Sequence, residues 1–431
     1  MTCSAGQSCC YSPWLTTDRS IFRTVCANLV HLAAESVKEN AQKMRGLSTR
    51  CVQGDGPQKA GPAVEPIFQT STFVFENQQE MLASVIGKSD KHVYTRWSNP
   101  TTRNVETRLS ALEHTEGSLM FSSGMAAISS AVFAMVHNGE RVLSCDSIYG
   151  GTLHLFEDIL PQSGISVDFV GLDELVDSIS DSNGRHRMCY FETPTNPTLG
   201  IVDVRAVAQA SREAGMLSVI DNTFATPINQ RPHEMGIDIV IHSATKYLGG
   251  HSDIIAGSVS ADEVHLAKVR KAARLLGGTP DPFAAFLLDR GIKTLALRME
   301  RHNSNAGYLA EKLSEDSRIR KVYYPGLRSH PRYEIACRQM DGFGGMLAID
   351  LDCNLETTER FVDSLQLFLN AVSLGGVQSL ASIPAITTHY GISDSVLERM
   401  GISKSTVRLS VGIEDPEDLL TDITTALSVV S

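Results

Sequence analysis

Short apolar runs alternate with helix-length amphipathic stretches from about residue 106 onward, and small or polar residues mark each junction. This alternation is typical of a wound α/β sheet with mostly parallel strands, because a strand buried on both faces needs a continuous apolar run. The runs that we expect to form strands are Leu119–Phe121, Val142–Cys145, Val167–Val170, Met188–Glu192, Leu217–Asp221, Ile237–Ile241 and Ile255–Ser260. The sequence therefore predicts an α/β fold.

The length of 431 residues is enough for two domains with additional segments. A helical region from Ala261 through Leu313 is expected to bridge from the sheet into a smaller α+β domain. That second domain mixes a strand at Gly345–Leu351 with helices at 355–367 and 415–429. The predicted segments are an N-terminal extension at 1–45, a loop-rich arm at 46–105, the sheet domain at 106–300 and the C-terminal domain at 301–431.

The N-terminal extension has apolar residues at helical spacing, which predicts one amphipathic helix. These residues are Ile21, Val25, Leu29, Leu32 and Val37. Acidic residues are few there, as in organelle transit peptides, but arginines are also few. A targeting segment, a packing arm and a disordered tail therefore stay open, and a cytoplasmic location is the expectation.

The formal net charge is −11 and no block of Lys and Arg stands out, which argues against nucleic-acid binding. No apolar run approaches the roughly 18 to 20 residues that cross a bilayer. Thirteen histidines include no HExxH pair, and the cysteines beyond residue 51 have no metal-ligand spacing. We therefore expect a soluble enzyme of metabolite chemistry without a metal.

Polar residues follow several predicted strands, where the functional groups of wound sheets gather. They include the Ser122–Met125 stretch, Tyr149, Asn196, Asp221 and Lys246. Lys246 stands in the Ser243–His251 stretch, between hydroxyl residues and glycines, directly after an apolar run. A lysine has no packing reason to be there, so we expect it to carry the chemistry.

These residues match the needs of an aldehyde cofactor. Lys246 supplies an amine for a Schiff base, and Asp221 supplies an acid for a protonated ring nitrogen. The helix that begins near Gly124 offers N–H groups to a phosphate, and Tyr149 offers a ring for stacking. Each residue also has an ordinary interpretation: a helix cap at Ser123, a turn aspartate, or a core tyrosine.

Ordered motifs from about residue 48 to 429 make the chain resemble the Cys/Met-metabolism family of pyridoxal-phosphate enzymes, the transsulfuration group, and most closely cystathionine γ-lyase. The resemblance implies the aminotransferase-like fold (fold type I) and pyridoxal 5′-phosphate as the cofactor. The motifs are Tyr94–Arg96, Asn99–Thr101, Ser123–Met125, Tyr149–Thr152, Glu192–Pro197, Asp221–Thr223, Ser243–Tyr247, Ser373–Gly376 and Val407–Gly412.

The resemblance also implies roles for the matched residues. Lys246 would hold the cofactor and shuttle protons, Asp221 would bind the ring nitrogen, and Tyr149 would stack and take part in proton transfer. Cofactor contacts are further implied for Gly124, Met125, Thr223, Ser243 and Thr245, and for Tyr94 and Arg96 donated by a neighbouring subunit. Arg408, with Asn196 and Ser373, would bind the substrate carboxylate. A homodimer is then the smallest active unit, and a homotetramer is the habit of the family.

Substrate choice is expected to depend on His154 and Gln378, where cystathionine enzymes commonly have arginine and glutamate. The loss of these charges argues against cystathionine as the preferred substrate. The phrase Ile383–His389, however, resembles the cystathionine γ-lyase version, whereas methionine γ-lyases usually have cysteine where this chain has Gly151.

We therefore expect a carbon–sulfur lyase that γ-eliminates cystathionine or a related sulfur amino acid to 2-oxobutanoate, ammonia and a thiol. Two other reactions stay open: γ-replacement on a homoserine ester, as in a cystathionine γ-synthase or sulfhydrylase, and methionine γ-elimination. A cofactor-binding paralogue without activity is the non-enzymatic alternative.

Overall fold

The computed structural model describes residues 45–55, 61–387, 390–391, 397 and 401–430. The chain divides into two units, Met1–Gly46 and Leu47–Ser431. The helix predicted in the N-terminal extension, together with His389 of the Ile383–His389 phrase, lies outside the described residues. The following account concerns the second unit.

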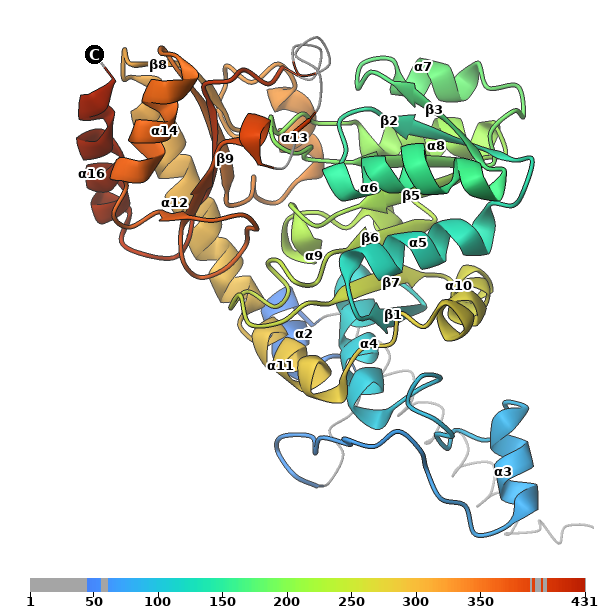
Figure 1. Cartoon of the computed structure of the whole chain (residues 1–431). Coiled ribbons are helices and arrows are strands. Elements are labelled where there is room, and N and C mark those ends of the chain that lie inside the picture. Colours follow the sequence, from blue (N-terminus) through green and yellow to red (C-terminus); the bar gives the residue numbers. More distant parts are fainter. Residues whose placement is uncertain (1–44, 56–60, 388–389, 392–396, 398–400, 431) are drawn as a thin grey trace, which may run out of the picture. The chain divides into compact units, whose positions relative to one another are not determined.

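A seven-stranded sheet forms the first half of this unit, in the order β1-β7-β6-β5-β4-β2-β3 (Figure 1). Strand β7 is antiparallel to both of its neighbours, and the remaining pairs are parallel. The strands are β1 (Gly117–Phe121), β2 (Arg141–Cys145), β3 (Ser166–Val170), β4 (Met188–Glu192), β5 (Leu217–Asp221), β6 (Ile239–His242) and β7 (Gly257–Ala261). The prediction of a mostly parallel α/β sheet is confirmed.

Polar residues at the N-cap positions begin several helices of this half. Ser123 accepts a hydrogen bond from the Ala126 N–H, and Asp203 accepts one from the Ala206 N–H. The helices are α4 (Pro100–Glu113), α5 (Gly124–Met135), α6 (Gly150–His154), α7 (Leu175–Ser180), α8 (Val204–Glu213) and α9 (Thr226–Asn229). Short π or 3-10 turns follow at Leu155–Ile159, Pro161–Ser163 and Pro232–Met235. The predicted cap role of Ser123 is thus observed.

The predicted helical region after β7 consists of three helices: α10 (Glu263–Leu276), α11 (Pro282–Ile292) and α12 (Leu295–Ser314). Gly277 ends α10 with φ of 81°, a left-handed conformation that favours glycine. Helix α12 runs from the first sheet toward the second in Figure 1. The predicted domain boundary at residue 300 falls within this helix.

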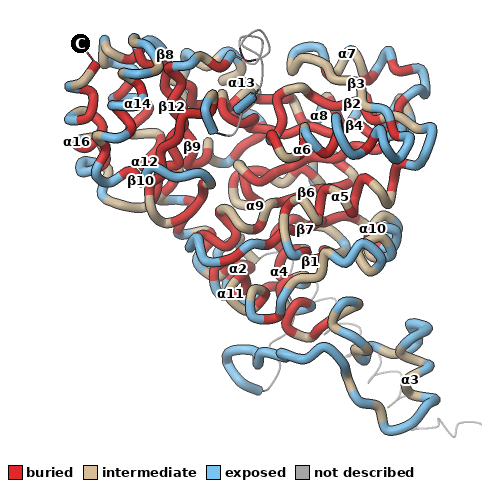
Figure 2. Tube along the Cα trace, in the orientation of Figure 1, coloured by how far each residue is buried: buried red, intermediate tan, exposed pale blue. Residues whose placement is uncertain are grey.

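A second sheet has five strands in the order β10-β11-β12-β9-β8. Its strands are β8 (Ile319–Tyr323), β9 (Met346–Leu351), β10 (Leu369–Asn370), β11 (Leu380–Ser382) and β12 (Thr406–Ser410). The accompanying helices are α13 (Tyr333–Gln339), α14 (Leu355–Ser364) and α16 (Pro416–Ala426), with 3-10 turns at Pro384–Ile386 and Leu427–Val429. Both sheets are buried along most of their length (Figure 2). The predicted strand and helices of the C-terminal region are observed here.

The predicted arm is partly helical, with α2 (Leu47–Gln53) and α3 (Gln78–Val85). Cys51 of α2 is buried with Val105 and Leu109 of α4, so this end of the arm belongs to the core. Residues 61–72, by contrast, are almost all exposed, as is Val74 at 96% (Figure 2). Helix α2 thus packs into the core of the sheet domain, residues 61–72 are exposed, and the arm at 46–105 stays a prediction.

None of the described helices is long and apolar enough to cross a membrane. Within the described ranges, no three side chains of His, Cys, Asp or Glu gather as a set of metal ligands. The described cysteines are unpaired thiols, of which Cys51, Cys145 and Cys189 are buried and Cys337 is exposed.

Candidate active site

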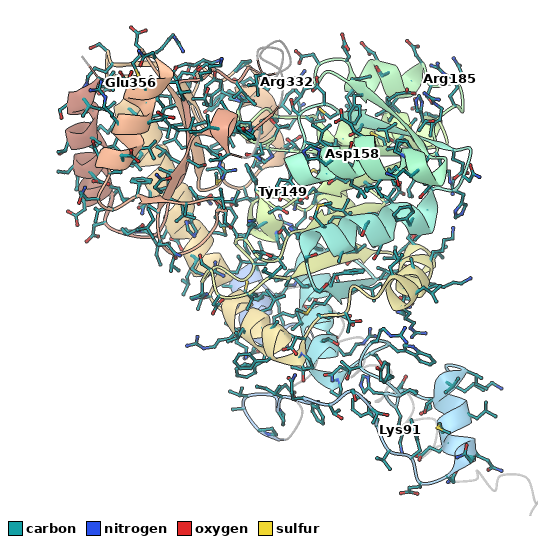
Figure 3. All side chains as sticks on the ribbon, viewed as in Figure 1. Lys91, Tyr149, Asp158, Arg185, Arg332 and Glu356 are labelled. Carbon is teal, nitrogen blue, oxygen red and sulfur yellow. The ribbon has the colours of Figure 1, made fainter. Side chains whose placement is uncertain are left out.

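A cavity of about 330 Å³ opens beyond the carboxyl ends of β4, β5 and β6, and residues of the second sheet close it. Tyr149, which is half-exposed, lies between the two sheets in Figure 3. Most of the residues predicted for the site line this cavity. They are Gly124, Met125, Tyr149, Asn196, Asp221, Thr223, Ser243, Thr245, Lys246, Ser373 and Arg408.

Lys246 enters the cavity from the loop after β6. Its Nζ donates a hydrogen bond to the Ser373 hydroxyl at 2.7 Å. Burial and, to a lesser extent, the nearby Arg408 guanidinium lower the pKa of the Lys246 amine to about 8, and the charge of Asp221 opposes this change. A larger fraction of this amine is therefore neutral near pH 7 than for an exposed lysine.

Asp221 ends β5, and its carboxylate is held by Thr223. The Asp221 Oδ1 accepts hydrogen bonds from the Thr223 N–H at 3.0 Å and from the Thr223 hydroxyl. The Ser243 N–H donates to the same hydroxyl at 2.8 Å. Burial raises the pKa of Asp221, although the Thr223 hydrogen bonds and the charges of His242 and Lys246 lower it. A buried carboxylate in this position favours a cationic partner, such as a protonated ring nitrogen.

Glu192 is a cavity residue that the sequence reasoning did not select for the site. It ends β4 and is the register partner of Asp221 on β5. Burial, followed by the charge of Asp221, raises the pKa of Glu192 well above its usual range. The signal that singled out Asp221, an acid at the end of an apolar strand, was equally present at Glu192.

The start of α5 forms a concave site for an anion, and glycines at Gly124 and Gly257 leave room for the close backbone packing there. A Cβ atom on Gly124 would lie 2.9 Å from the Ser243 Cβ, and one on Gly257 would lie 2.1 Å from the Ser123 carbonyl oxygen. The first N–H groups of a helix have no carbonyl partner within the helix, so those of Gly124 and Met125 suit an anion. Thr245 lines the same cavity, but its hydroxyl donates to the Ala256 carbonyl and accepts from the Ala256 N–H.

Arg408 on β12 faces the cavity from the second sheet. It is 3% exposed, and its Nη1 donates to the Asn196 Oδ1 at 3.0 Å. Its Nη2 donates to the Ser373 carbonyl at 3.1 Å. Burial lowers the pKa of Arg408 to about 10, so the guanidinium still carries its charge at neutral pH. A buried, charged fork of this kind suits a carboxylate ligand.

Helix α12 contacts the segments that carry both charged groups. Arg298 donates a hydrogen bond at 2.7 Å to the carbonyl of Tyr247, the residue that follows Lys246. His302 bonds the Val411 carbonyl through Nδ1 at 2.7 Å, shortly after Arg408. Burial lowers the pKa of His302 to about 4, so it makes this contact as a neutral donor.

Four predicted site residues do not line the cavity of this chain: Tyr94, Arg96, His154 and Gln378. The Arg96 guanidinium lies 5.5 Å from the centre of the Tyr94 ring and donates to the Arg274 carbonyl. The exposed His154 lies 3.3 Å from Asp158. The structure therefore does not bring these four residues to the cavity of their own chain, and their roles stay predictions.

Gln378 donates to the Ser252 hydroxyl at 2.8 Å, outside the cavity. The outer wall of the cavity is instead apolar and comes largely from loops. Sequence patterns do not predict where loops lie in the fold. The apolar cavity residues that the sequence reasoning missed are Ile128, Pro194, Phe224, Ile255, Val372 and Leu374.

The cavity thus holds an amine with a lowered pKa, an acid at a strand end, a helix N-terminus and a guanidinium, a donor set that fits pyridoxal phosphate. The sequence profile of the Cys/Met metabolism PLP-dependent enzymes matches residues 48–428. The chain belongs to this family. Pyridoxal 5′-phosphate is accordingly its cofactor, and the aminotransferase-like fold implied by the motifs is confirmed.

Known members of the family are similar over most of this chain. Cystathionine β-lyase from Lactococcus lactis subsp. cremoris is 41% identical, over 89% of this chain and 99% of that protein. L-methionine γ-lyase from Pseudomonas putida is 40% identical, over 90% and 98%. The crystal structure of cystathionine γ-lyase from Lactobacillus plantarum complexed with L-serine superposes with a TM-score of 0.83 and 36% identity, over 90% and 99%. These names cover different activities, so the family is established and the reaction is not.

Proposed function

We propose that this protein is a carbon–sulfur lyase that γ-eliminates a thiol from a sulfur amino acid and, with one water molecule, releases 2-oxobutanoate and ammonia. The observation that carries the proposal is the meeting of two charged groups at Ser373. The Lys246 amine contacts the Ser373 hydroxyl, and the Arg408 guanidinium contacts its carbonyl. An amino acid bound by its carboxylate at Arg408 presents its α-carbon to the amine.

Each residue has a task in this reaction. When bound, pyridoxal phosphate withdraws electrons from the α-carbon of the substrate. Lys246 takes the α-proton and moves protons to and from the β-carbon. Tyr149 supplies a proton to the departing sulfur, and Asp221 keeps the ring nitrogen of the cofactor protonated. Arg408 and Asn196 fix the carboxylate, so that the substrate lies in one orientation.

The lining of the cavity supports a substrate with an uncharged thioether. Apart from Lys246 and Arg408, the described residues that line it include no basic side chain. The exposed apolar side chains of Ile255 and Val372 line it instead. The carboxylate of the second amino-acid head group of cystathionine finds no further basic partner among the described lining residues, whereas a methionine side chain suits the apolar wall. Methionine is therefore a candidate substrate of the proposed γ-elimination beside cystathionine.

Tyr94 and Arg96 are proposed to complete the cofactor site of a neighbouring subunit. Both residues stand in the segment that follows the exposed middle of the arm. Because they lie outside the cavity of their own chain, this role requires a homodimer or homotetramer. Sedimentation velocity of the enzyme, with cofactor retention measured in Arg96→Ala, tests it. A monomer with full cofactor retention contradicts this role.

Incubation with methionine, cystathionine, and O-acylhomoserine with and without cysteine or sulfide tests the reaction. The proposal expects 2-oxobutanoate and a thiol from methionine or cystathionine without any added thiol. Pyruvate as the keto acid would mean β-elimination. Consumption of the ester alone, and only with a thiol, would establish γ-replacement, and no turnover with bound cofactor would favour the non-enzymatic paralogue.

A further inference from the structure

Two buried carboxyl groups stand side by side at the edge of the first sheet. Glu192 and Asp221 are register partners on the adjacent parallel strands β4 and β5, so their side chains point to the same face. Both line the cavity, and they are 6% and 9% exposed. The proposed reaction uses Asp221 and leaves Glu192 without a task.

Glu192 holds the turn that carries Tyr149. Its Oε1 accepts a hydrogen bond from the Tyr149 N–H at 2.8 Å. Tyr149 precedes the first residue of α6, and a Cβ atom on Gly151 would lie 2.6 Å from the Tyr149 Cε1. The Tyr149 ring therefore packs against Gly151, and the Glu192 carboxyl group holds the Tyr149 backbone N–H. These two contacts set the position of the Tyr149 ring in the cavity.

The neighbouring groups decide which of the two acids carries the charge. Asp221 accepts two hydrogen bonds from Thr223, and these bonds together with the electrostatic interactions with His242 and Lys246 lower its pKa. Among the described residues, only the Tyr149 N–H donates to Glu192 and stabilises a negative charge there, and Asp221 and Tyr190 are the titratable neighbours of Glu192. Two ionised carboxylates side by side in a buried site repel each other strongly, so one of them keeps its proton.

We propose that Glu192 is a positioning residue of the cofactor site. In its protonated form it holds the Tyr149 turn and leaves Asp221 as the single carboxylate charge beneath the cofactor ring. The inference rests on the proposed function, because it assigns the ring nitrogen to Asp221 and the stacking to Tyr149.

Three variants test this role. Glu192→Gln keeps a neutral acceptor for the Tyr149 N–H, whereas Glu192→Ala removes the acceptor. Glu106→Ala is the control, because the partly buried Glu106 also accepts a backbone N–H, that of Met120 at 3.1 Å, and does not line the cavity. The readouts are the dissociation constant of the cofactor and the visible circular dichroism of each bound cofactor.

Glu192→Ala is expected to weaken cofactor binding about tenfold and to reduce the visible dichroism, because the Tyr149 N–H loses its partner. Glu192→Gln is expected to stay within about threefold of the wild type in cofactor affinity, since it changes neither charge nor acceptor. Glu106→Ala is expected to leave both readouts unchanged. Equal binding by wild type and Glu192→Ala would overturn the positioning role.

Infrared spectroscopy of the holoenzyme tests the protonation. The difference between wild type and Glu192→Gln is expected to contain the carbonyl band of a protonated carboxylic acid. A difference that contains only carboxylate bands would overturn the protonated form. A wild-type protein that binds no cofactor would contradict the proposed function instead, whereas normal binding with an unchanged Glu192→Ala contradicts only this inference.

Discussion

Lys246 and Arg408 come from different sheets and meet at one residue, Ser373. The Lys246 Nζ donates to the Ser373 hydroxyl at 2.7 Å, and the Arg408 Nη2 donates to its carbonyl at 3.1 Å. Ser373 has a φ of 86°, an unusual conformation for a residue with a side chain. Such backbone strain is common at functional sites, and here it accompanies contacts to both charged groups.

Replacement of Lys246 tests its role in catalysis separately from any role in folding. Lys246→Ala is expected to reduce turnover at least about a thousandfold, because the proton-transfer group is lost. The fold is expected to persist, since the variant removes a buried cation. Keto-acid release and thermal unfolding measure the two effects. Lys268→Ala, on the exposed face of α10, is the control, and appreciable turnover by Lys246→Ala would remove the lysine from its role.

The amine of Lys246 predicts how cofactor capture by the apoenzyme depends on pH. Only the neutral amine attacks an aldehyde, and its fraction rises as the pH passes the pKa of about 8. The capture rate is therefore expected to rise with pH and to reach half its maximum near pH 8, in stopped-flow absorbance. Arg408→Gln is expected to move this midpoint upward, because the Arg408 charge lowers the pKa of the amine. An unmoved midpoint would speak against that electrostatic contribution.

Arg408→Lys tests carboxylate binding. A lysine keeps the charge but loses the planar pair of donors, one of which bonds Asn196 at 3.0 Å. KM is expected to rise about 10- to 100-fold, the effect of losing a hydrogen bond to a charged group, with a smaller change in kcat. Steady-state kinetics measure both constants. Arg338→Lys, an exposed residue of α13, is the control, and an unchanged KM in Arg408→Lys would place the carboxylate elsewhere.

Gly124→Ala tests the anion cradle at the start of α5. The added Cβ would lie 2.9 Å from the Ser243 Cβ, so one of the two segments must shift. We expect the dissociation constant of pyridoxal phosphate to rise about tenfold, measured by equilibrium dialysis. Gly307→Ala in α12 is the matched control, because its Cβ would meet its nearest atom at 3.8 Å. Equal cofactor affinity of both variants would exclude a cradle at Gly124.

The strands and the centre of the site were predictable because burial on two faces leaves a strong signal. Predicted and observed bounds agree at Met188–Glu192 and Leu217–Asp221, where the apolar run is the whole strand. Lys246 and Asp221 were found because a charged group at the end of such a run has no packing reason to be there. Glu192 carried the same signal and was missed.

The outer wall of the cavity was beyond sequence reasoning. Ile255 was predicted to begin a strand at Ile255–Ser260, but β7 begins only at Gly257, so Ile255 lies in a loop, as does Val372. Nothing in the local pattern of these two apolar residues distinguishes a cavity wall from an exposed loop. His154 and Gln378 were chosen by comparison with the family, but His154 pairs with Asp158 and Gln378 bonds Ser252. Whether such residues reach the cavity depends on where the loops lie in the tertiary structure, and sequence periodicity does not predict this.

Helix α12 links the two halves of the site through hydrogen bonds to both. Arg298 binds the carbonyl that follows Lys246, and one turn later His302 binds the chain that follows Arg408. The backbone next to the amine and the backbone near the guanidinium are thus both hydrogen-bonded to the same helix. We therefore expect discrimination between amino acids to depend on the loop residues that line the cavity, which substitutions can change while the contacts of α12 persist.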